Sequence, residues 1–554
     1  MMKRFVIILL SCLASFLALG ATPQKMGRFV VGLPDYPKHL LHYLGADEYG
    51  LAVNQLVLEP LIELSPKTNL PEPRLAAKWK IENGGKQIAF TLHHNAKFHD
   101  KKPVTSKDVL FTWELIQSHP QFVPLREYFR AFEKCEAPSP HVFRCHASKP
   151  HFKNLEIFSE FRVLPQHVYQ NTDIKAATAT SLIGSGPYQI STVQPGERII
   201  LKRDPNFWAV SHPTNQDRFH FDEIHFRAIS DAQTQFEVFK NNEIDYFYFQ
   251  ISKMWFVDTK NPLFEKGYLQ KLKIENQIPH APMSIAWNLR RPLFQDKRVR
   301  QALTHLMNRE KWIQDLFYGA YQISAGPLSL NSDYHSAGVV PLRFDPKKAR
   351  ELLQEAGWKP NSVGVMQREG KSFEFELLSD SPAMNRFLTL YQEDLKQMGI
   401  LMAIKTVDWV TSLRLIEERE FDAVPLSRTR EVEPGNFGAE WGSDQASIKG
   451  SRNLTGYQSK KVDFLSKKID ASLTKTDRKQ WIRQLEAILA DEIPVSYLWE
   501  PTYFRLGYWN RFSFPEKGYY PYSRWRDAFH YWWFDPKKAE NLKKAQQEGS
   551  EVPG

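Results

Sequence analysis

Hydrophobic and polar residues alternate over two short stretches in the first part of the chain. In Gln87 to Leu92 the apolar side chains fall at every second position, and Ala77 to Glu82 is amphipathic in the same way. Between these stretches, Asn83 to Lys86 supplies residues that tolerate positive φ. The pattern predicts a β-hairpin.

A helix is predicted shortly after this hairpin. Its apolar stripe consists of Val109, Leu110, Trp113 and Ile116. The preceding run from Thr105 to Asp108 offers a hydroxyl that can cap the helix and a carboxylate near its positive end. The stretch from Arg74 to Trp113 therefore has the order strand, strand, helix.

The second half of the chain alternates between strand and helix patterns. Strands are predicted at 373–379, 402–407 and 421–427, with helices at 386–398 and 410–418 between them. Such alternation argues for an α/β lobe built on a mainly parallel sheet.

The two ends of the chain differ from the rest. Lys3 and Arg4 precede an apolar run from Phe5 to Leu19, and small residues follow, so residues 1–21 are predicted to be a secretory signal peptide. Cys12 loosely resembles a lipoprotein processing site, which leaves lipidation as an alternative. The last segment, 535–554, is rich in Lys, Glu and Gln and is expected to be a loose tail.

The length of the chain indicates its number of structural units, and its charge distribution bears on whether it binds nucleic acid. A chain of 554 residues is too long for one core and suggests three or four structural units. The net charge is +10, but Lys and Arg are scattered among acids and no nucleic-acid-binding module is present. We therefore expect no nucleic-acid partner.

Cys135 and Cys145 are the cysteines that remain after the predicted signal peptide. They lie on two strand-like arms that flank a Pro-rich turn, so their Cα atoms could face each other across a hairpin. In an oxidising compartment this arrangement predicts a disulfide. Two unpaired thiols are the alternative.

Several motifs together resemble one protein family. The stretch Arg74 to Trp113, the turn Val163 to Tyr169, the crossing Ile183 to Tyr188 and the segment Leu201 to Trp208 resemble the signature of the bacterial extracellular solute-binding proteins of family 5, the receptors of peptide and nickel ABC importers. Stretches of the second half and the ending Trp532 to Asp535 are similar to the Yej-type branch of its oligopeptide receptors.

This resemblance implies an α/β fold, that of a two-lobed periplasmic binding protein (class II-like, type C cluster). A small inserted α+β domain and a hinged ligand cleft are expected with it. The implied division is a first lobe from 22–62, 188–289 and 494–534, an inserted domain at 63–187, a second lobe at 290–493 and the tail at 535–554.

The resemblance also implies a function. The protein is expected to be a monomeric periplasmic receptor that binds oligopeptides by backbone pairing and delivers them to an inner-membrane ABC permease with a cytoplasmic ATPase. No cofactor is expected. The alternatives are a non-peptide ligand, such as a metal chelate or a modified peptide, and an exported hydrolase. No His-Glu-x-x-His motif, Gly-x-Ser-x-Gly motif or phosphate-binding loop supports the hydrolase.

The resemblance points to Val424 to Asn436 as the ligand-binding segment. In peptide receptors of the family, the segment before an acidic-Pro turn pairs with the peptide backbone and supplies an acid for its ammonium group. Here Glu431 is the first candidate acid and Glu433 the second, whereas Arg428 and Arg430 could hold a carboxylate instead. Solvated loop charges are the alternative. The complete candidate set is Ser427, Arg428, Arg430, Glu431, Glu433, Asn436, Trp441, Trp287 and Asn288.

Two further groups of residues have a bearing on the site. His93, His94 and His99 are not predicted to bind metal, because His93 and His94 would point to opposite faces of a strand. The aromatic segment Lys517 to Phe534 either packs on the first lobe or lines the cleft with rigid rings.

Overall fold

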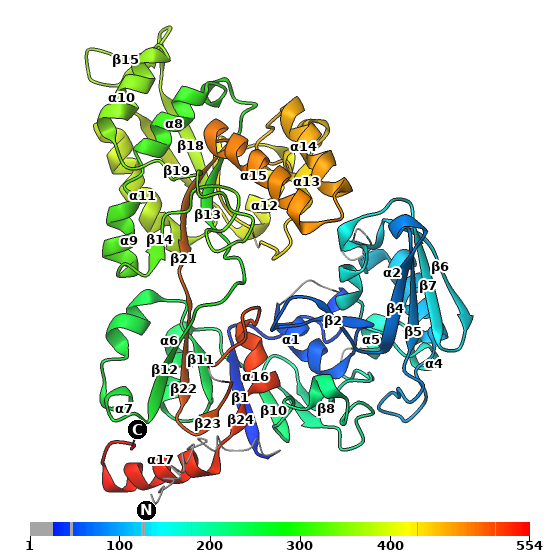
Figure 1. Cartoon of the computed structure of the whole chain (residues 1–554). Helices are drawn as coiled ribbons and strands as arrows, with labels where there is room; N and C mark the ends of the chain where they lie inside the picture. The colour runs from blue at the N-terminus through cyan, green and yellow to red at the C-terminus, as the bar shows by residue number, and fades with distance from the viewer. Residues whose placement is uncertain are drawn as a thin grey trace, which may run out of the picture.

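The structure is a computed structural model that describes residues 26–44, 48–122, 126, 128–178, 180–428, 430–515 and 517–553. The predicted signal peptide and Cys12 lie outside the described residues. Two lobes, each built on its own sheet, are stacked one above the other, and a smaller inserted domain lies beside them (Figure 1). Among the described helices, none is long and apolar enough to cross a membrane.

The first lobe contains a mixed sheet of seven strands. Its order is β12-β22-β11-β1-β10-β9-β8, so segments from the start, the middle and the end of the chain lie side by side. The strand β1 is central because its apolar residues, among them Phe29 and Val31, are buried between covering elements. The strands are β1 (Arg28–Leu33), β8 (Tyr188–Gln194), β9 (Arg198–Arg203), β10 (Glu223–Ala228), β11 (Tyr246–Tyr248), β12 (Leu269–Ile274) and β22 (Phe504–Trp509). The helices are α1 (Glu48–Val57), α6 (Ala232–Lys240), α7 (Pro262–Glu265) and α16 (Ala528–Tyr531).

The inserted domain carries the predicted hairpin and helix. The hairpin strands join through Asn83, Gly84 and Gly85, all at positive φ, and Thr105 and Asp108 form a capping box at the start of the helix. Cys135 and Cys145 lie opposite each other in neighbouring strands and form the predicted disulfide. The four-stranded sheet has the order β4-β5-β7-β6. The elements are β2 (Ile62–Leu64), β3 (Pro71–Pro73), β4 (Ala76–Glu82), β5 (Gln87–Leu92), α2 (Ser106–Ser118), β6 (Phe132–Ser139), β7 (Val142–Ala147), α4 (Gln166–Tyr169) and α5 (Ile174–Ala177).

The second lobe contains a six-stranded sheet of order β14-β21-β13-β20-β18-β19. The three strands predicted from strand and helix alternation are parallel to one another, as expected, but the other pairings are antiparallel. The sheet is therefore mixed rather than mainly parallel. Its strands are β13 (Met283–Trp287), β14 (Tyr321–Gln322), β18 (Glu374–Ser379), β19 (Leu401–Thr406), β20 (Ala423–Ser427) and β21 (Val495–Pro501). The helices are α8 (Lys297–His305), α9 (Arg309–Phe317), α10 (Pro346–Glu355), α11 (Pro382–Gln397), α12 (Trp409–Glu418), α13 (Phe437–Trp441), α14 (Lys460–Ala471) and α15 (Lys475–Glu492). A small ribbon at its far end consists of β15 (Lys359–Pro360), β16 (Met366–Arg368) and β17 (Lys371–Ser372).

Two of the predicted lobe boundaries are corrected by these strand pairings. β13 and β21 were assigned to the first lobe by the boundaries at 289 and 494, yet both lie in the sheet of the second lobe. Their side chains, such as Trp287 and Leu498, are buried in the second lobe's core. Both strands come directly before or after a chain crossing, and their sequence alone does not show to which sheet they belong.

The C-terminal segment is helical, which corrects the prediction of a loose tail. Helix α17 (Pro536–Glu548) begins after Asp535, whose carboxylate accepts hydrogen bonds from two backbone N–H groups at 3.1 Å. Leu542 and Ala545 are buried, and the Tyr268 hydroxyl donates to the Ala545 carbonyl at 3.1 Å. The helix packs against the first lobe next to two strands of the C-terminal segment, β23 (Phe512–Ser513) and β24 (Trp533–Phe534) (Figure 1).

Candidate functional site

The chain crosses between the two lobes twice. It leaves β12 and enters β13 through residues 275–282, and it returns from β21 to β22 through residues 502–503. Met283, where β13 begins, lies opposite Ser427, the last residue of β20. Leu506, close to the start of β22, lies opposite Tyr248, the last residue of β11. The carboxyl ends of β20 and β11 therefore both lie at the crossings.

The parallel neighbours of these two strands end at the same edges. In the second lobe β18 and β19 run with β20, and in the first lobe β1 and β10 run with β11. The carboxyl edges of two parallel strand sets thus lie on either side of the crossings, one of which is seen in Figure 1 where β21 runs down toward β22. Ligands of open α/β sheets bind outside the carboxyl ends of the strands, so this space is the candidate ligand cleft.

Strand β20 lies between β13 and β18, and one border is open to a ligand only at its last residues, past the end of β18. It pairs with β13 over its whole length, whereas its described pairing with β18 involves only Ala423 and Leu377. The following residues of β20 lead directly to the cleft and end at the exposed Ser427. A peptide in extended conformation could add its backbone to this border.

A hydrogen-bond network ties the two crossings together at the base of the cleft. Glu500, at the end of β21, is fully buried and accepts from the Leu330 N–H at 2.8 Å and from the Ser329 hydroxyl at 3.1 Å. Asn331 donates from its side chain to the Ile278 carbonyl at 2.9 Å, and Ile278 belongs to the other crossing. These bonds hold the hinge side of the cleft in place.

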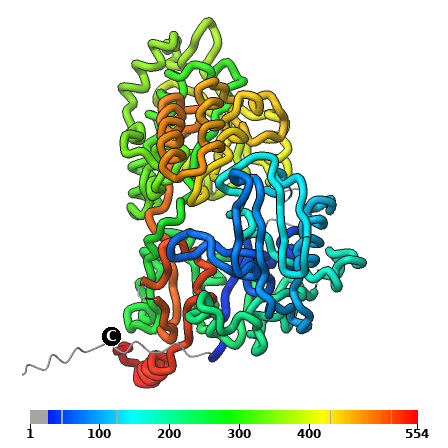
Figure 2. Tube along the Cα trace, turned by 45° about the vertical axis from the view of Figure 1, so that its right-hand side comes forward, coloured from blue at the N-terminus to red at the C-terminus, as the bar shows by residue number. Residues whose placement is uncertain are grey.

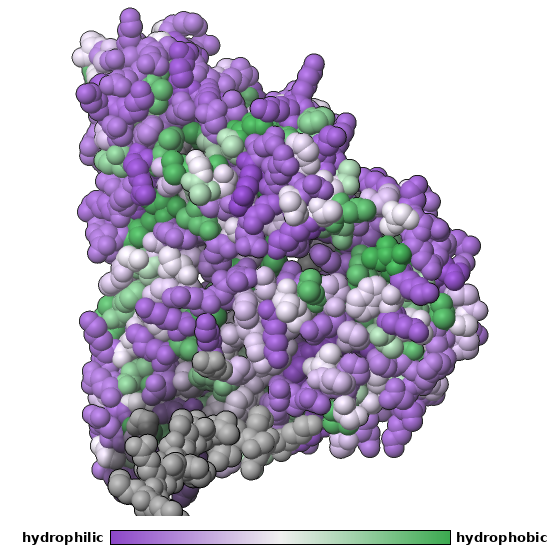
Figure 3. All heavy atoms as spheres, viewed as in Figure 1, coloured by the Kyte–Doolittle hydropathy of each residue, from purple (hydrophilic) through white to green (hydrophobic). Residues whose placement is uncertain are grey.

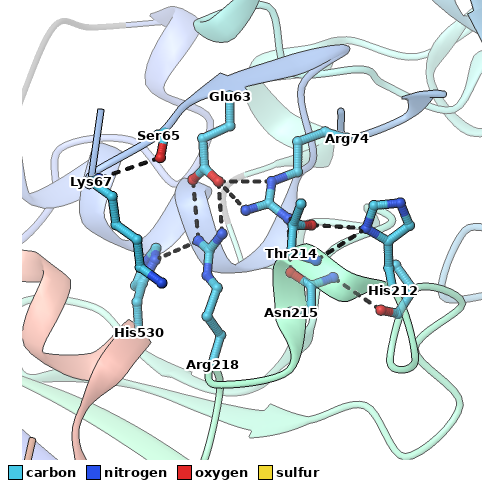
Figure 4. Close-up of polar contacts among 10 residues, drawn as sticks. Glu63, Ser65, Lys67, Arg74, His212, Thr214, Asn215, Arg218 and His530 are labelled. Carbon is cyan, nitrogen blue, oxygen red and sulfur yellow. Dashed lines mark hydrogen bonds and ion pairs between the residues drawn. The ribbon is translucent and has the colours of Figure 1, made fainter. Parts of the chain in front are cut away.

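The inserted domain is anchored to the first lobe through Glu63 (Figure 4). Arg218 binds its carboxylate with two nitrogens at 2.7 and 3.1 Å, and Arg74 binds the same carboxylate from the other side. Arg74 also donates to Asn215 at 2.8 Å, and Arg218 contacts the His530 ring nitrogen at 3.1 Å. Both arginines are buried, so removing one partner would leave an uncompensated charge.

Glu59 is a second carboxyl at this junction, and it is buried. Its Oε2 accepts a hydrogen bond from the Trp208 indole at 2.6 Å. Burial, with Glu63 nearby, raises the pKa of Glu59 to about 8. The folded protein therefore holds a proton on Glu59 at neutral pH that the unfolded chain releases.

The stability of this junction should depend on pH through Glu59. Because the pKa is higher in the folded state, the stabilisation is complete below the unfolded pKa of about 4.5 and is lost as the pH rises toward 8. Between pH 5 and pH 7, the wild-type free energy of unfolding should fall by about 2 kcal/mol relative to that of Glu59→Gln, which keeps an acceptor for Trp208.

Urea unfolding of both proteins at the two pH values measures this difference. Other titrating groups contribute equally to both proteins and cancel. Glu133→Gln, which alters an exposed carboxyl on β6, should follow the wild type. Parallel pH profiles of wild type and Glu59→Gln would contradict the assignment.

The inserted domain also contacts the second lobe across the cleft. Lys153 forms an ion pair with Glu431, and the Arg478 guanidinium lies 4.0 Å from the centroid of the Phe152 ring. Figure 2 shows the blue and cyan inserted domain close below the yellow and orange helices of the second lobe, as in Figure 1. The cleft is therefore closed on this side. Figure 3 shows a largely hydrophilic surface on this face, with hydrophobic residues gathered near where the lobes meet.

Two carboxyl groups lie close enough within this contact for the charge of one to act on the other. Glu156 belongs to the inserted domain and Glu433 to the second lobe, where Arg478 binds Glu433 at 2.8 Å. Burial and Glu433 raise the pKa of Glu156 to about 7, against the opposing effect of Lys153 and Arg478, and Glu431 raises it further. Opening the cleft would separate Glu156 from Glu433 and return it to water.

Closure should therefore tighten as the pH falls. The pKa of Glu156 is raised in the closed form and is about 4.5 in water, as in an open form. The closed form is therefore stabilised over the open form below pH 4.5, and this stabilisation is lost as the pH rises through about 7. X-ray scattering of the ligand-free protein should give a smaller radius of gyration at pH 5.5 than at pH 8. Glu156→Gln should stay compact at both values, and an unchanged pH dependence in this variant would exclude Glu156 as the cause.

The predicted ligand residues fall into two groups. Ser427, Arg428, Arg430, Glu431 and Glu433 follow one another at the cleft edge, and Asn436 begins α13 in the left-handed conformation with φ of 59°. Glu431 is paired with Lys153, and Glu433 with Arg478 and the Tyr334 hydroxyl. Recognition of an ammonium group by Glu431 stays a prediction.

Trp287 and Asn288 are buried away from the cleft edge, which corrects their prediction as ligand contacts, whereas Trp441 is buried next to Glu440 and its role as a ligand contact stays a prediction. Trp287 ends β13 at the far side of the sheet and donates to the Ser496 hydroxyl at 2.8 Å. Asn288 donates to the Phe421 carbonyl at 2.8 Å. Trp441 packs in the core near Tyr457, with ring centroids 6.3 Å apart. Trp287 and Asn288 support the lobe instead.

Sequence reasoning missed two apolar residues at the cleft edge. Trp409 is 66% exposed and Val410 73% exposed, and both lie at the start of α12 directly after the carboxyl end of β19. They fall outside the buried stripe of α12, to which Leu415 belongs. The sequence did contain a signal for these two residues. They are apolar, they lie off the buried face of a predicted helix, and they come just after a predicted parallel strand.

The remaining candidates do not add to the site. Among the described residues, no group of three or more His, Cys, Asp or Glu side chains is arranged to hold a metal ion. Much of the aromatic C-terminal segment is buried in the first lobe, including Phe529 and Trp532. A hollow of about 240 Å³ at the other edge of the second lobe is lined by charges that already pair, such as Arg291 with Asp422.

The fold and the cleft define a two-lobed ligand-binding protein. Residues 71–447 match the family described as bacterial extracellular solute-binding proteins, family 5 Middle. The chain belongs to this family, as predicted.

Individual relatives agree with this assignment. YejA of Escherichia coli K12 is 26% identical over 515 residues, covering 86% of this chain and 83% of YejA. The oligopeptide-binding protein AppA of Bacillus subtilis is 26% identical over 535 residues, covering 92% of both chains. The structure of AppA with a nonapeptide superposes with a TM-score of 0.73 at 22% identity, covering 93% of this chain and all of AppA. NikA of Brucella suis with Fe(III)-EDTA gives a TM-score of 0.74 at 19% identity, covering 88% of this chain and 96% of NikA.

Proposed function

We propose that the protein is a periplasmic receptor of an ABC importer that captures oligopeptides between its two lobes. The observation that carries this proposal is the border of β20 past the end of β18, at the carboxyl edge facing the parallel strands of the first lobe. Backbone N–H and C=O groups at such a border bind an extended peptide whatever its side chains are. The exposed Trp409 and Val410 could contact those side chains without specific pairing.

The comparisons support a peptide ligand over a metal chelate. AppA, a relative over 92% of the chain, is named an oligopeptide-binding protein, and its similar structure contains a nonapeptide. NikA with its iron chelate shares the fold at lower identity. Because the family consists of solute-binding proteins, we infer that this chain acts by binding and not by catalysis.

The closed lobes suggest how binding leads to transport. Lys153 and Glu431 join the inserted domain to the second lobe, so a peptide held between the lobes would add contacts to the closed form. We infer that the closed, monomeric receptor delivers its ligand to the membrane permease and its ATPase. Export to the periplasm would depend on residues 1–21.

Native mass spectrometry of protein purified from the periplasm without refolding tests this proposal. Wild-type protein should carry a mixture of peptides. Ser427→Trp would place a large ring at the cleft edge of β20 and should reduce peptide occupancy at least tenfold. Leu401→Trp, at the exposed start of β19 on the other edge of the same sheet, should keep wild-type occupancy.

Two outcomes would contradict the proposal. A bound metal chelate in place of peptides would identify a different ligand class. Hydrolysis of added peptides by the purified protein would identify an enzyme.

A further inference from the structure

Three arginines surround a single carboxylate at the cleft edge of the second lobe. Glu440 is buried and lies 3.5 Å from Arg428, 3.3 Å from Arg430 and 3.1 Å from Arg452. The Arg428 and Arg430 side chains are only 19% and 14% exposed, whereas Arg452 is 57% exposed. The cluster therefore carries more positive charge than Glu440 can balance.

The excess charge is costly where the arginines are partly removed from water. Burial lowers the pKa of Arg428, and Arg430 and Arg452 lower it further against the effect of Glu440. The buried Nε of Arg430 has no hydrogen-bond partner among the described residues. A further anion would supply both the missing charge and an acceptor.

The cluster stands where a ligand would arrive. Arg428 directly follows Ser427, the last residue of β20, at the carboxyl edge of the sheet. On the opposite side of the cleft, the exposed Tyr128 of the inserted domain is close enough to Arg452 and Glu431 for their charges to act on its hydroxyl. The cluster therefore borders the space between the inserted domain and the second lobe.

The acids of the same segment are already neutralised. Glu431 pairs with Lys153 of the inserted domain. Glu433 pairs with Arg478 at 2.8 Å and lies 3.5 Å from Lys475. At this edge the unbalanced charge is therefore positive, which disfavours an ammonium group and favours an anion.

We propose that Arg428, Arg430 and Arg452 form a subsite for a carboxylate of the bound peptide. The planar guanidinium groups can bind such a carboxylate with two parallel hydrogen bonds. This proposal rests on the proposed function, and it assigns the end of the peptide at β20 to an anionic group instead of the N-terminal ammonium group.

Calorimetry with a synthetic pool of random pentapeptides that lack ionisable side chains tests the proposal. The pool is used in three forms, with free termini, with an N-acetyl group and with a C-terminal amide. Amidation should weaken binding at least tenfold, and N-acetylation less than threefold. An amidated pool that carries one Glu side chain regains affinity if the carboxylate comes from a side chain, and stays weak if it comes from the C-terminus.

Variants of the arginine cluster test whether the difference in affinity between acid and amide peptides arises there. Arg428→Gln with Arg430→Gln should remove most of the difference between acid and amide forms. Arg419→Gln is the matched control, because Arg419 donates to the Ser451 carbonyl at 2.6 Å and has no ion pair with Glu440 among the described contacts. Glu440→Gln should tighten binding of the free-acid pool, a gain that misfolding cannot produce.

Failure of the carboxylate subsite and failure of the proposed function give different results. Equal binding of acid and amide forms, or a tenfold loss on N-acetylation alone, would overturn the carboxylate subsite while leaving peptide capture in place. Binding of none of the pools would overturn the proposed function and the subsite together.

Discussion

Because β12 leads into β13 and β21 leads into β22, each lobe holds one strand that arrives at the hinge and one that leaves it. β20 pairs antiparallel with β13, and β11 pairs antiparallel with β22, so both must end at the hinge. The strands that run parallel to β20 and β11 therefore end on the same side of their sheets. The direction of the two crossings thus turns the carboxyl edges of both sheets toward one space, and the buried Glu500 fixes the crossings relative to each other.

Local sequence patterns predicted the elements whose stability is mostly local. The hairpin at Asn83 to Gly85 and the capping box at Thr105 and Asp108 formed as expected, because turn and cap residues act on their immediate neighbours. The membership of β13 and β21 was not predictable in this way, since it depends on partners far along the chain. Helix α17 was missed because it packs on partners far along the chain, such as Tyr268, whose hydroxyl donates to the Ala545 carbonyl 277 residues later.

The sequence placed the candidate site along the chain, but it did not indicate the charge balance there. The segment after β20 does reach the cleft edge, and the resemblance to the family located it. Its electrostatics depend on distant partners: Lys153 lies 278 residues before Glu431, and Arg478 lies 45 residues after Glu433. Only the folded chain shows that these acids are engaged and that Arg428 and Arg430 share one carboxylate. Buried residues such as Trp287 look like ligand contacts in sequence because aromatic rings serve both roles.

Hydrogen exchange with and without bound peptide tests most directly whether the ligand pairs with the carboxyl edge of β20. If it does, the amides of Leu426 and Ser427 should exchange at least tenfold more slowly in the peptide complex, while the amides at the start of β19 around Leu401 keep their rates. Protection confined to the start of β19, or unchanged exchange at Leu426 and Ser427 in a peptide-bound protein, would contradict the account.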